Sequence, residues 1–411
     1  MRVLWFSVTP SMFNPCSNSH NGGGWIASLE KIVRTEALVE LGVAFEFMDR
    51  NFKYESKGVY YYPISSKKLS IYDKLRGRTN VEDKLAKCLR IIDDFKPDLI
   101  QIFGSENDFG LICEHTEVPV IIHIQGCLPP YHNALFPVGI NKYDFYFARR
   151  LTWRYRWIGL RSEPAFRKQA EQEIRIIQSC QYFMGRTEWD KGLADLFNPR
   201  AKYFHCDEAL RDVFLQNTKV WGDRESPEIR IISVISNPWY KGVDLILKTA
   251  QLLKRFVKLD FEWQVYGVQN ENVAFYENKY DIRANNVNVK IMGAVSKDKL
   301  VDVLCNATCF VHPSYIDNSP NSVCEAQILG LPVLATHVGG ISSIVKDGET
   351  GILFPANDPY TLASKIKEVT QSPELAVRLG KVAREQALKR HDPMMIRMTL
   401  INIYKQILEN G

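Results

Sequence analysis

The sequence predicts an α/β protein whose two doubly wound parallel sheets face each other across a cleft. Short and almost continuous apolar runs, which are typical of strands covered on both faces, alternate along the chain with segments of helical periodicity. A polar segment at 216–228, which contains Gly222 and Pro227, interrupts this alternation. It divides the 411 residues into two halves that each have their own series of strands.

The elements follow in the order that such sheets require. In the first half we expect strands at 2–8, 45–50, 99–104, 120–126 and 181–186, and helices at 25–41 and 80–95. In the second half we expect strands at 229–236, 261–268, 289–294, 308–313, 332–336 and 351–354, and helices at 241–257, 297–304 and 358–370. The domains are therefore expected at 1–215 and 216–391, with an amphipathic helix at 392–411 packing back on the first. Such sheets bind ligands at their carboxyl edges.

Composition excludes several classes of protein. With 45% hydrophobic and 24% charged residues, the chain is neither disordered nor collagen-like nor a coiled coil. No apolar run reaches the roughly 18 residues of a transmembrane helix, and the run at 2–8 is too short for a signal peptide. The nine cysteines include no Cys-x-x-Cys pair, which favours reduced thiols and a cytoplasmic location. No metal-ligand cluster and no Asp-x-Asp motif is evident, so we expect neither a metal nor a cofactor.

The segment 311–356 carries the most information about function. Its pattern predicts a strand ending near Val311, a polar loop, and a helix from about Ser322 that stops at Gly330. Ser322 to Glu325 fits a capping box, so one interpretation is that Glu325 only caps its own helix. The other is that this turn directs free N–H groups at a ligand in the cleft. The side chains that would meet a hydroxyl-rich ligand are Asp317, Asn318, Ser319, Asn321, Ser322 and Glu325.

Cationic and glycine-rich positions indicate a phosphate site. Lys241-Gly242 lies at the start of a predicted helix, where a lysine opposes the helix dipole unless an anion lies between them. The glycine triplet Gly22-Gly23-Gly24 between the first strand and first helix would let the backbone approach a phosphate, although a flexible loop explains it equally well. Arg186, followed by the expected helix cap Thr187, would neutralise a diphosphate if it faces the cleft, and otherwise forms a surface ion pair.

These motifs together resemble the signature of family-4 glycosyltransferases, which are retaining enzymes of the GT-B fold. The matching residues are Pro313-Ser314, Asp317, Glu325-Ala326, Gly330-Leu331-Pro332-Val333, Gly339-Gly340 and Asp347-Gly348-Glu349-Thr350-Gly351. The resemblance implies that Glu325 binds the nucleotide ribose, that Asp317 faces the transferred sugar and that Lys241-Gly242 binds phosphate. It also implies that the first domain binds the acceptor and the second the donor.

The chain departs from this family's pattern at several positions. Asp317 replaces the usual Glu and reaches roughly 1.5 Å less far. Asn318-Ser319-Pro320 stands where Gly-Phe-Gly is usual, which puts the identity of the donor sugar in question. Ser236, followed by Asn237, takes the place of an arginine, so Arg186 is our candidate for the second cation. Gln125 holds the position of the active-site histidine, while His123 is expected to be structural. Val295, after the strand at 289–294, completes the candidate set.

The resemblance implies a metal-independent hexosyltransferase that uses a nucleotide sugar, with a UDP-sugar as the expected donor. The expected acceptor is a glycan or a lipid-linked sugar in bacterial surface polysaccharide or glycoconjugate synthesis. Two alternatives stay open at this point. One is a non-catalytic sugar-nucleotide-binding scaffold, and the other is a different GT-B enzyme such as an epimerase or a phosphorylase.

The basic segment 149–168 concentrates the chain's positive charge. It contains seven Arg and Lys residues and one acid, Glu163, whereas the whole chain has a net charge of only +5. Trp153 and Trp157 are four residues apart, so a helix would present aromatic and basic faces side by side. The segment therefore predicts contact with an anionic membrane surface or an anionic acceptor, and a peripheral position at the inner face of the membrane. A solvated helix is the alternative, and nucleic acid is not expected.

Overall fold

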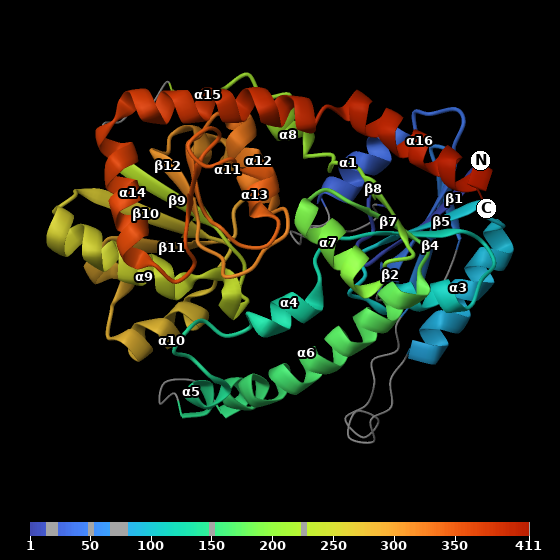
Figure 1. Ribbon diagram of the computed structural model, residues 1–411, viewed down its shortest axis with the longest axis horizontal. Helices are drawn as coiled ribbons and strands as arrows, with labels where there is room; N and C mark the ends of the chain where they lie inside the picture. The colour runs from blue at the N-terminus through green and yellow to red at the C-terminus, as the bar shows by residue number, and fades with distance from the viewer. Residues whose placement is uncertain (14–23, 48–52, 66–80, 148–152, 223–227, 411) are drawn as a thin grey trace.

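The computed structural model describes residues 1–13, 24–47, 53–65, 81–147, 153–222 and 228–410. They form two α/β domains that lie side by side, the first on the right and the second on the left of Figure 1. Gly22 and Gly23 of the expected phosphate loop lie outside the described residues, and so does 149–152 of the basic segment.

The first domain is built on an eight-stranded sheet. Its strands are β1 (Arg2–Ser7), β2 (Glu40–Phe47), β3 (Tyr54–Ser56), β4 (Val59–Ser65), β5 (Leu99–Phe103), β6 (Val120–His123), β7 (Tyr182–Gly185) and β8 (Lys202–His205). They lie in the order β3-β4-β2-β1-β5-β6-β7-β8. All neighbours run parallel except the edge pair β3–β4, so the sheet is mixed rather than wholly parallel as predicted.

Helices cover both faces of this sheet, which is why its central strands β1, β5 and β6 are apolar and almost wholly buried. The helices of the first domain are α1 (Gly24–Val33), α3 (Val81–Phe95), η1 (Asp108–Glu114), α4 (Leu128–Asn133), α5 (Lys142–Phe147), α6 (Trp153–Ser179) and α7 (Glu188–Phe197). α1 packs on one face, and α3, η1, α6 and α7 pack on the other. The expected helix at 25–41 ends at Val33 instead, because β2 begins at Glu40 and pairs with β1.

The second domain has a six-stranded sheet that is parallel throughout. Its strands are β9 (Ile229–Val234), β10 (Phe261–Tyr266), β11 (Val289–Gly293), β12 (Cys309–His312), β13 (Val333–Thr336) and β14 (Ile352–Phe354), in the order β11-β10-β9-β12-β13-β14. The helices around it are α8 (Asp212–Leu215), η2 (Trp239–Lys241), α9 (Val243–Leu252), η3 (Leu253–Val257), α10 (Asn270–Tyr280), η4 (Ala284–Val287), α11 (Lys297–Cys305), α12 (Asn321–Leu329), α13 (Ile341–Ile344), α14 (Pro359–Gln371) and α15 (Pro373–Arg390).

The chain crosses between the domains at two neighbouring places. Ala209 lies in the core of the first domain, whereas Leu210 and Phe214 lie in the core of the second, so the first crossing comes before the boundary expected at 215. The second crossing follows α15, where α16 (Pro393–Asn410) returns to the first domain. Figure 1 shows α15 along the second domain and α16 over the first, where Tyr404 Oη accepts a hydrogen bond of 3.0 Å from Trp5 Nε1.

α6 contains most of the basic segment in one helix of 27 residues, with Pro164 inside it. Side chains up to 162 lie outside the description, and those of Arg167 and Lys168 are exposed. Glu163 lies 3.5 Å from both His132 and Lys142. Within the described ranges, no helix combines the length and the apolar character that crossing a membrane requires.

Candidate functional site

Three charged or titratable side chains meet at the carboxyl edge of the second sheet. Lys241 Nζ, at the end of η2, lies 2.6 Å from Asp317 Oδ2 in the loop after β12. The same oxygen lies 2.9 Å from Nε2 of His312, the last residue of β12. The segment after β9 and the end of β12 therefore place the Lys241 ammonium group and the His312 imidazole against the same carboxylate.

This arrangement keeps Asp317 ionised. Burial alone would raise the pKa of its carboxyl, but Lys241 and His312 outweigh burial and hold that pKa well below its usual range. Burial also lowers the pKa of His312, so its ring is neutral at pH 7. Since an ionised carboxylate can only accept hydrogen bonds, the geometry assigns the ring proton of His312 to Nε2.

Two glycine positions allow other backbone segments to pack closely against the backbone of the loop that carries Asp317. Gly242 has a φ of +80°, and a Cβ there would lie 2.1 Å from the carbonyl oxygen of Pro313. Gly339 has a φ of +51°, and a Cβ there would lie 1.9 Å from the carbonyl oxygen of Asp317. The next N–H, of Gly340, donates to that same oxygen at 3.0 Å. The Lys-Gly and Gly-Gly motifs are thus packing requirements of the Asp317 loop.

Glu325 does not cap its own helix. α12 starts at Asn321 after Pro320, and no side chain caps it, so the predicted capping box is wrong. Instead Glu325 Oε1 accepts hydrogen bonds from Arg211 Nε at 2.7 Å and from the Arg211 terminal nitrogen at 2.6 Å. Burial raises the pKa of the Glu325 carboxyl to about 7 despite the opposing effect of Arg211. The carboxylate that the resemblance assigns to ribose is therefore paired with the segment that crosses between the domains.

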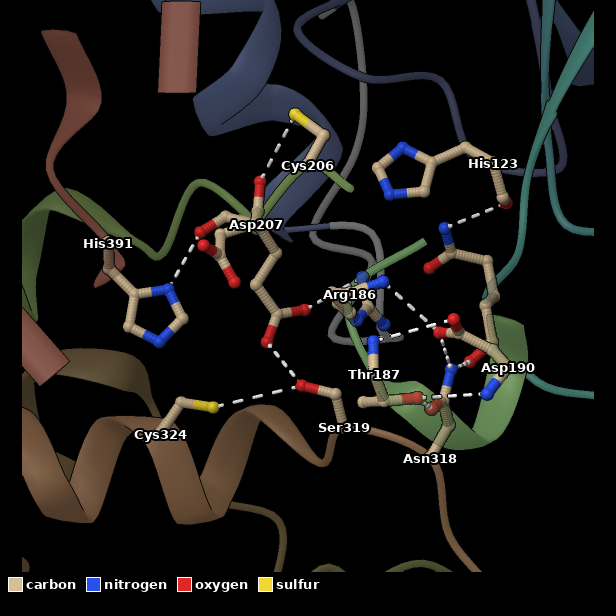
Figure 2. Close-up of polar contacts among 12 residues, drawn as sticks. His123, Arg186, Thr187, Asp190, Cys206, Asp207, Asn318, Ser319, Cys324 and His391 are labelled. Atoms are coloured by element: carbon tan, nitrogen blue, oxygen red, sulfur yellow. Dashed lines mark hydrogen bonds and ion pairs between the residues drawn. The ribbon is translucent and has the colours of Figure 1, made fainter. Parts of the chain in front are cut away.

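The loop after β12 is hydrogen-bonded to the first domain through Asn318. Its amide oxygen accepts from Thr187 Oγ1 at 2.6 Å, and its amide nitrogen donates to Asp190 Oδ2 at 3.0 Å and to the carbonyl oxygen of Gln125 at 3.2 Å. Thr187 and Asp190 form the capping box of α7, so the cap predicted at Thr187 is confirmed. Figure 2 shows Asn318, Thr187 and Asp190 facing one another.

Arg186 lies beside this contact and is buried. It forms an ion pair of 3.0 Å with Glu208, and its guanidinium lies 5.4 Å from the centre of the Trp25 ring. Glu208 also accepts a hydrogen bond of 3.2 Å from Ser319 Oγ, and Asn321 contacts the same carboxylate once its amide is oriented to donate. In Figure 2, Arg186 lies between Thr187 and the carboxylate that Ser319 contacts. Arg186 is therefore neither on the surface nor free, but it lies where the two domains meet.

Aromatic side chains also pack across the boundary between the two domains. The rings of Tyr131 and Tyr240 stack with centres 5.2 Å apart, and those of Phe136 and Trp239 stack at 5.0 Å. In each pair one ring comes from the α4 region of the first domain and the other from η2 of the second. Lys241 therefore follows directly on residues that are packed against the first domain.

A polar cavity of about 150 Å³ opens at the carboxyl edge of the first sheet. Glu173 of α6 is buried there and accepts hydrogen bonds of 2.5 Å from Ser105 Oγ and from the N–H of Leu128. Burial raises the pKa of Glu173 to about 8, and it raises that of Glu106 to about 7 against the effect of Arg186. The cavity is lined by Glu46, Lys84, Ser105, Glu106, Asn107, Asp108, Gln169, Gln172, Glu173 and Ile176.

Several of the candidate site residues predicted from the sequence lie apart from the contacts around Asp317 and Lys241. Ser236 and Asn237 are exposed, and Asn237 Oδ1 accepts from the N–H of Gln269. Ser322 and Val295 are half-buried, and no hydrogen bond joins either of them to Asp317 or Lys241 within the described residues. Gly24 begins α1.

His123 and Gln125 lie at the carboxyl end of β6. Burial holds the pKa of His123 well below its usual range, and its ring packs 5.2 Å from that of Trp25. Gln125 Nε2 donates to the carbonyl oxygen of His123 at 3.3 Å. The buried ring of His123 agrees with the expectation that it is structural.

The sequence did not reveal Glu208, Arg211, His312, Asp190 or Glu106. Glu208 and Arg211 follow β8, a strand that the apolar pattern did not show. His312 and Glu106 could have been found, because each lies at or just after the end of an expected strand, where ligands bind.

Part of the chain is similar in sequence to known glycosyltransferases. Residues 219–386 match the family described as Glycosyl transferases group 1. The chain is 35% identical over 99 residues to a D-inositol 3-phosphate glycosyltransferase of Streptomyces avermitilis, covering 24% of this chain and 21% of that protein. It is 26% identical over 211 residues to an N,N'-diacetylbacillosaminyl-diphospho-undecaprenol alpha-1,3-N-acetylgalactosaminyltransferase of Campylobacter jejuni, covering 51% of this chain and 52% of that protein. The matches thus span about a fifth to about half of these curated relatives.

Solved structures show the fold over the whole chain. Sucrose-phosphate synthase of Thermosynechococcus elongatus superposes with a TM-score of 0.75 at 14% identity, over 100% of both chains. HepE of Anabaena, solved in complex with UDP-glucose, gives a TM-score of 0.67 at 12% identity, over 99% of this chain and 100% of that one. The chain has the GT-B fold, as predicted.

Proposed function

We propose that this protein is a retaining glycosyltransferase that transfers a sugar from a nucleotide-sugar donor to a glycan or lipid-linked acceptor. The observation that carries the proposal is the group formed by Lys241, Asp317 and His312 at the carboxyl edge of the second sheet, with Glu325 on the adjoining helix. The family match covers this half of the chain and agrees with it.

The donor is proposed to lie between Glu325 and Lys241. Carboxylate oxygens suit the two ribose hydroxyls, and a lysine at the entrance of α9 suits a diphosphate. Lys241 is paired with Asp317, so a bound diphosphate would share the ammonium group of Lys241 with the Asp317 carboxylate. The HepE structure contains UDP-glucose, which supports a UDP-sugar as the first donor to test.

The proposed chemistry breaks the bond between the anomeric carbon and the diphosphate oxygen. Lys241 and the N–H groups at the start of α9 would stabilise the charge that develops on the leaving phosphate, without a metal ion. The acceptor hydroxyl would then form the new bond on the same face of the sugar and pass its proton to the leaving phosphate. Asp317 would stay ionised throughout and accept hydrogen bonds from the sugar hydroxyls.

The acceptor is proposed to bind at the carboxyl edge of the first sheet. The cavity next to Glu106 and Glu173 is polar, and its amide and carboxyl groups suit a sugar rich in hydroxyl groups. The Campylobacter relative is named for a lipid-linked diphosphate acceptor, which is consistent with a basic helix, α6, leading away from this cavity. We propose that the enzyme works in surface polysaccharide or glycoconjugate synthesis, at the cytoplasmic face of a bacterial membrane.

The test is a turnover assay with UDP-glucose and other nucleotide sugars, with detection of released nucleoside diphosphate and of the new glycoside. We expect activity that survives EDTA and a product with the anomeric configuration of the donor, determined by NMR. Lys241→Ala is expected to lose about 10²–10³-fold in kcat because the leaving charge loses its cation. Lys365→Ala is the matched control, since Lys365 pairs with Glu368 on the exposed side of α14.

Three outcomes would count against the proposal. Binding without turnover would favour a scaffold, and an altered free nucleotide sugar would indicate an epimerase. Loss of activity in EDTA with rescue by manganese would contradict the metal-independent step.

A further inference from the structure

Arg211 lies between the two domains at the place where the chain crosses from one to the other. Its guanidinium pairs with Glu325 in the middle of α12. Its aliphatic part covers the start of α1, where a Cβ on Gly24 would lie 3.0 Å from Arg211 Cδ. The next residue, Asp212, forms an ion pair with Lys31 of α1. Arg211 therefore links the beginning of the first helix of one domain to the predicted nucleotide-binding helix of the other.

The contact uses only one oxygen of Glu325. Both guanidinium nitrogens donate to Oε1, at 2.7 and 2.6 Å, and no other described residue donates a hydrogen bond to Oε2. The Glu325 side chain is 3% exposed and that of Arg211 is 30% exposed, so Glu325 is buried and solvent reaches the pair mainly at Arg211. Because two nitrogens of the planar guanidinium hold Oε1, the direction in which Oε2 points is fixed as well.

From this geometry we infer that Arg211 is a positioning residue for the nucleotide. It acts through Glu325, by holding Oε1 so that Oε2 points at the ribose hydroxyls. The inference rests on the proposed function, because it assumes that Glu325 meets a ribose. It adds that recognition of the nucleotide by the second domain depends on a residue of the crossing segment, which is packed against the first domain.

The part of the chain that the structure describes offers no substitute for Arg211. Besides Arg211, the described charged group that acts on Glu325 is Glu208, a carboxylate, which favours the protonated form of Glu325. From α15, Arg384 donates to the carbonyl oxygen of Ile328, and Arg390 donates to Gln327 and to the carbonyl oxygen of Ile344. Without Arg211, Glu325 would lose both its orientation and its main source of charge stabilisation.

The test compares two nucleotides that differ only at the ribose. Wild type, Arg211→Gln and Arg211→Lys are titrated by calorimetry with UDP and with 2′,3′-dideoxy-UDP, and in parallel with GDP and its dideoxy form. Hydrogen bonds to a charged group predict that wild type prefers the ribose form by about 10–100-fold. In Arg211→Gln this preference is expected to fall below about threefold. Lys, which provides a point charge without the fork, should restore it in part.

Glu325→Gln serves as the reference for a lost carboxylate. If Arg211 acts through Glu325, the double variant Arg211→Gln/Glu325→Gln discriminates the two nucleotides no less than Glu325→Gln alone. Equal weakening of both nucleotides in Arg211→Gln would overturn the inference, since it would mean that Arg211 binds the diphosphate or only stabilises the fold. An unchanged preference would overturn it as well. If wild type binds neither UDP nor GDP, it is the proposed function that fails, before any variant is compared.

Discussion

Asp317 and Lys241 show how the site balances charge at the level of single residues. The carboxylate is buried, yet Lys241 at 2.6 Å and His312 at 2.9 Å keep its pKa well below the usual range. The missing methylene, compared with a glutamate, is consistent with this direct contact to the lysine. A donor diphosphate would share Lys241 with Asp317, so binding of the leaving group and orientation of the sugar are coupled through one ammonium group.

The sequence could identify Lys241, Asp317 and Glu325, but it could not identify the partner of Glu325. Lys241, Asp317 and Glu325 stand in motifs with defined spacing, so they can be recognised one by one. Arg211 is 114 positions away from Glu325 in the chain and belongs to no motif that the sequence revealed. Partners of this kind are fixed by how two domains pack, and a linear pattern holds no information about that packing.

At this scale we predict that nucleotide affinity depends on pH through Glu325. Its folded-state pKa is raised to about 7, so the carboxylate is increasingly protonated as the pH falls below that value. A protonated carboxyl is a weaker acceptor for ribose hydroxyls, and UDP affinity is expected to rise about 5–10-fold between pH 6 and pH 8. Calorimetric titrations across this range measure it.

Glu325→Gln is the control, because its amide does not titrate. Any pH dependence that persists in this variant belongs to the phosphate of UDP and can be subtracted. If wild type and variant show the same profile, Glu325 is not the titrating group. The charged neighbours of Glu325, Arg211 and Glu208, are unchanged in this comparison.

At the scale of elements, the loop after β12 is held by the N-terminus of α7. Asn318 donates to Asp190 in the first turn of α7 and accepts from the N-cap residue Thr187, so a single amide joins the loop to the helix start. A glycine at position 318 could not make these side-chain contacts. The departure at 318–320 therefore creates a contact between the domains that glycine would not provide.

We predict that Asn318 and Thr187 are energetically coupled. A double-mutant cycle with Asn318→Ala and Thr187→Val, followed by urea unfolding, is expected to give a coupling of about 0.5–1.5 kcal/mol. Thr187→Val should in addition cost about 1 kcal/mol because α7 loses its cap. Thr187→Ser keeps the hydroxyl and is the control. Strictly additive losses would show that the contact contributes nothing to stability.

Elements could be predicted where their apolar pattern was complete, and only there. The buried strands of the second sheet and the helices α3, α9, α11 and α14 were found at nearly their observed bounds. β4 contains three consecutive tyrosines and a proline, and β8 alternates exposed and buried residues over only four positions, so neither reads as a buried strand. The interpretation of Ser322 to Glu325 as a capping box was wrong because Pro320 holds the N-cap position and Glu325 has a partner elsewhere.

At the scale of the whole molecule, the two crossings between the domains are joined. Nδ1 of His391, between α15 and α16, lies 2.9 Å from the carbonyl oxygen of Glu208 in the other crossing. Glu208 in turn contacts Arg186 and Ser319, and Arg211 contacts Glu325. The connection between the domains is therefore continuous with the proposed donor site, and any change in their relative orientation must act on these contacts. No motif in the sequence predicted that residues of the two crossings would contact residues of the candidate site.

The last prediction concerns the basic segment 149–168 and the membrane. A quadruple variant, Arg149→Gln, Arg150→Gln, Arg154→Gln and Arg156→Gln, is expected to bind vesicles of phosphatidylglycerol and phosphatidylcholine at least about tenfold more weakly than wild type, because each basic residue near an anionic surface contributes on the order of 1 kcal/mol. UDP affinity should be unchanged, since the proposed donor site lies in the second domain.

The control removes the same total charge from elsewhere, at the exposed residues Lys367, Lys381, Lys389 and Lys405. If the segment is a membrane contact, this variant keeps most of its vesicle binding, and added salt weakens binding of wild type more than that of the arginine variant. Equal losses in both variants would mean that only net charge matters. Full vesicle binding by the arginine variant would leave the segment as a solvated helix, and the acceptor would then have to reach the first-domain cavity without help from an anionic surface.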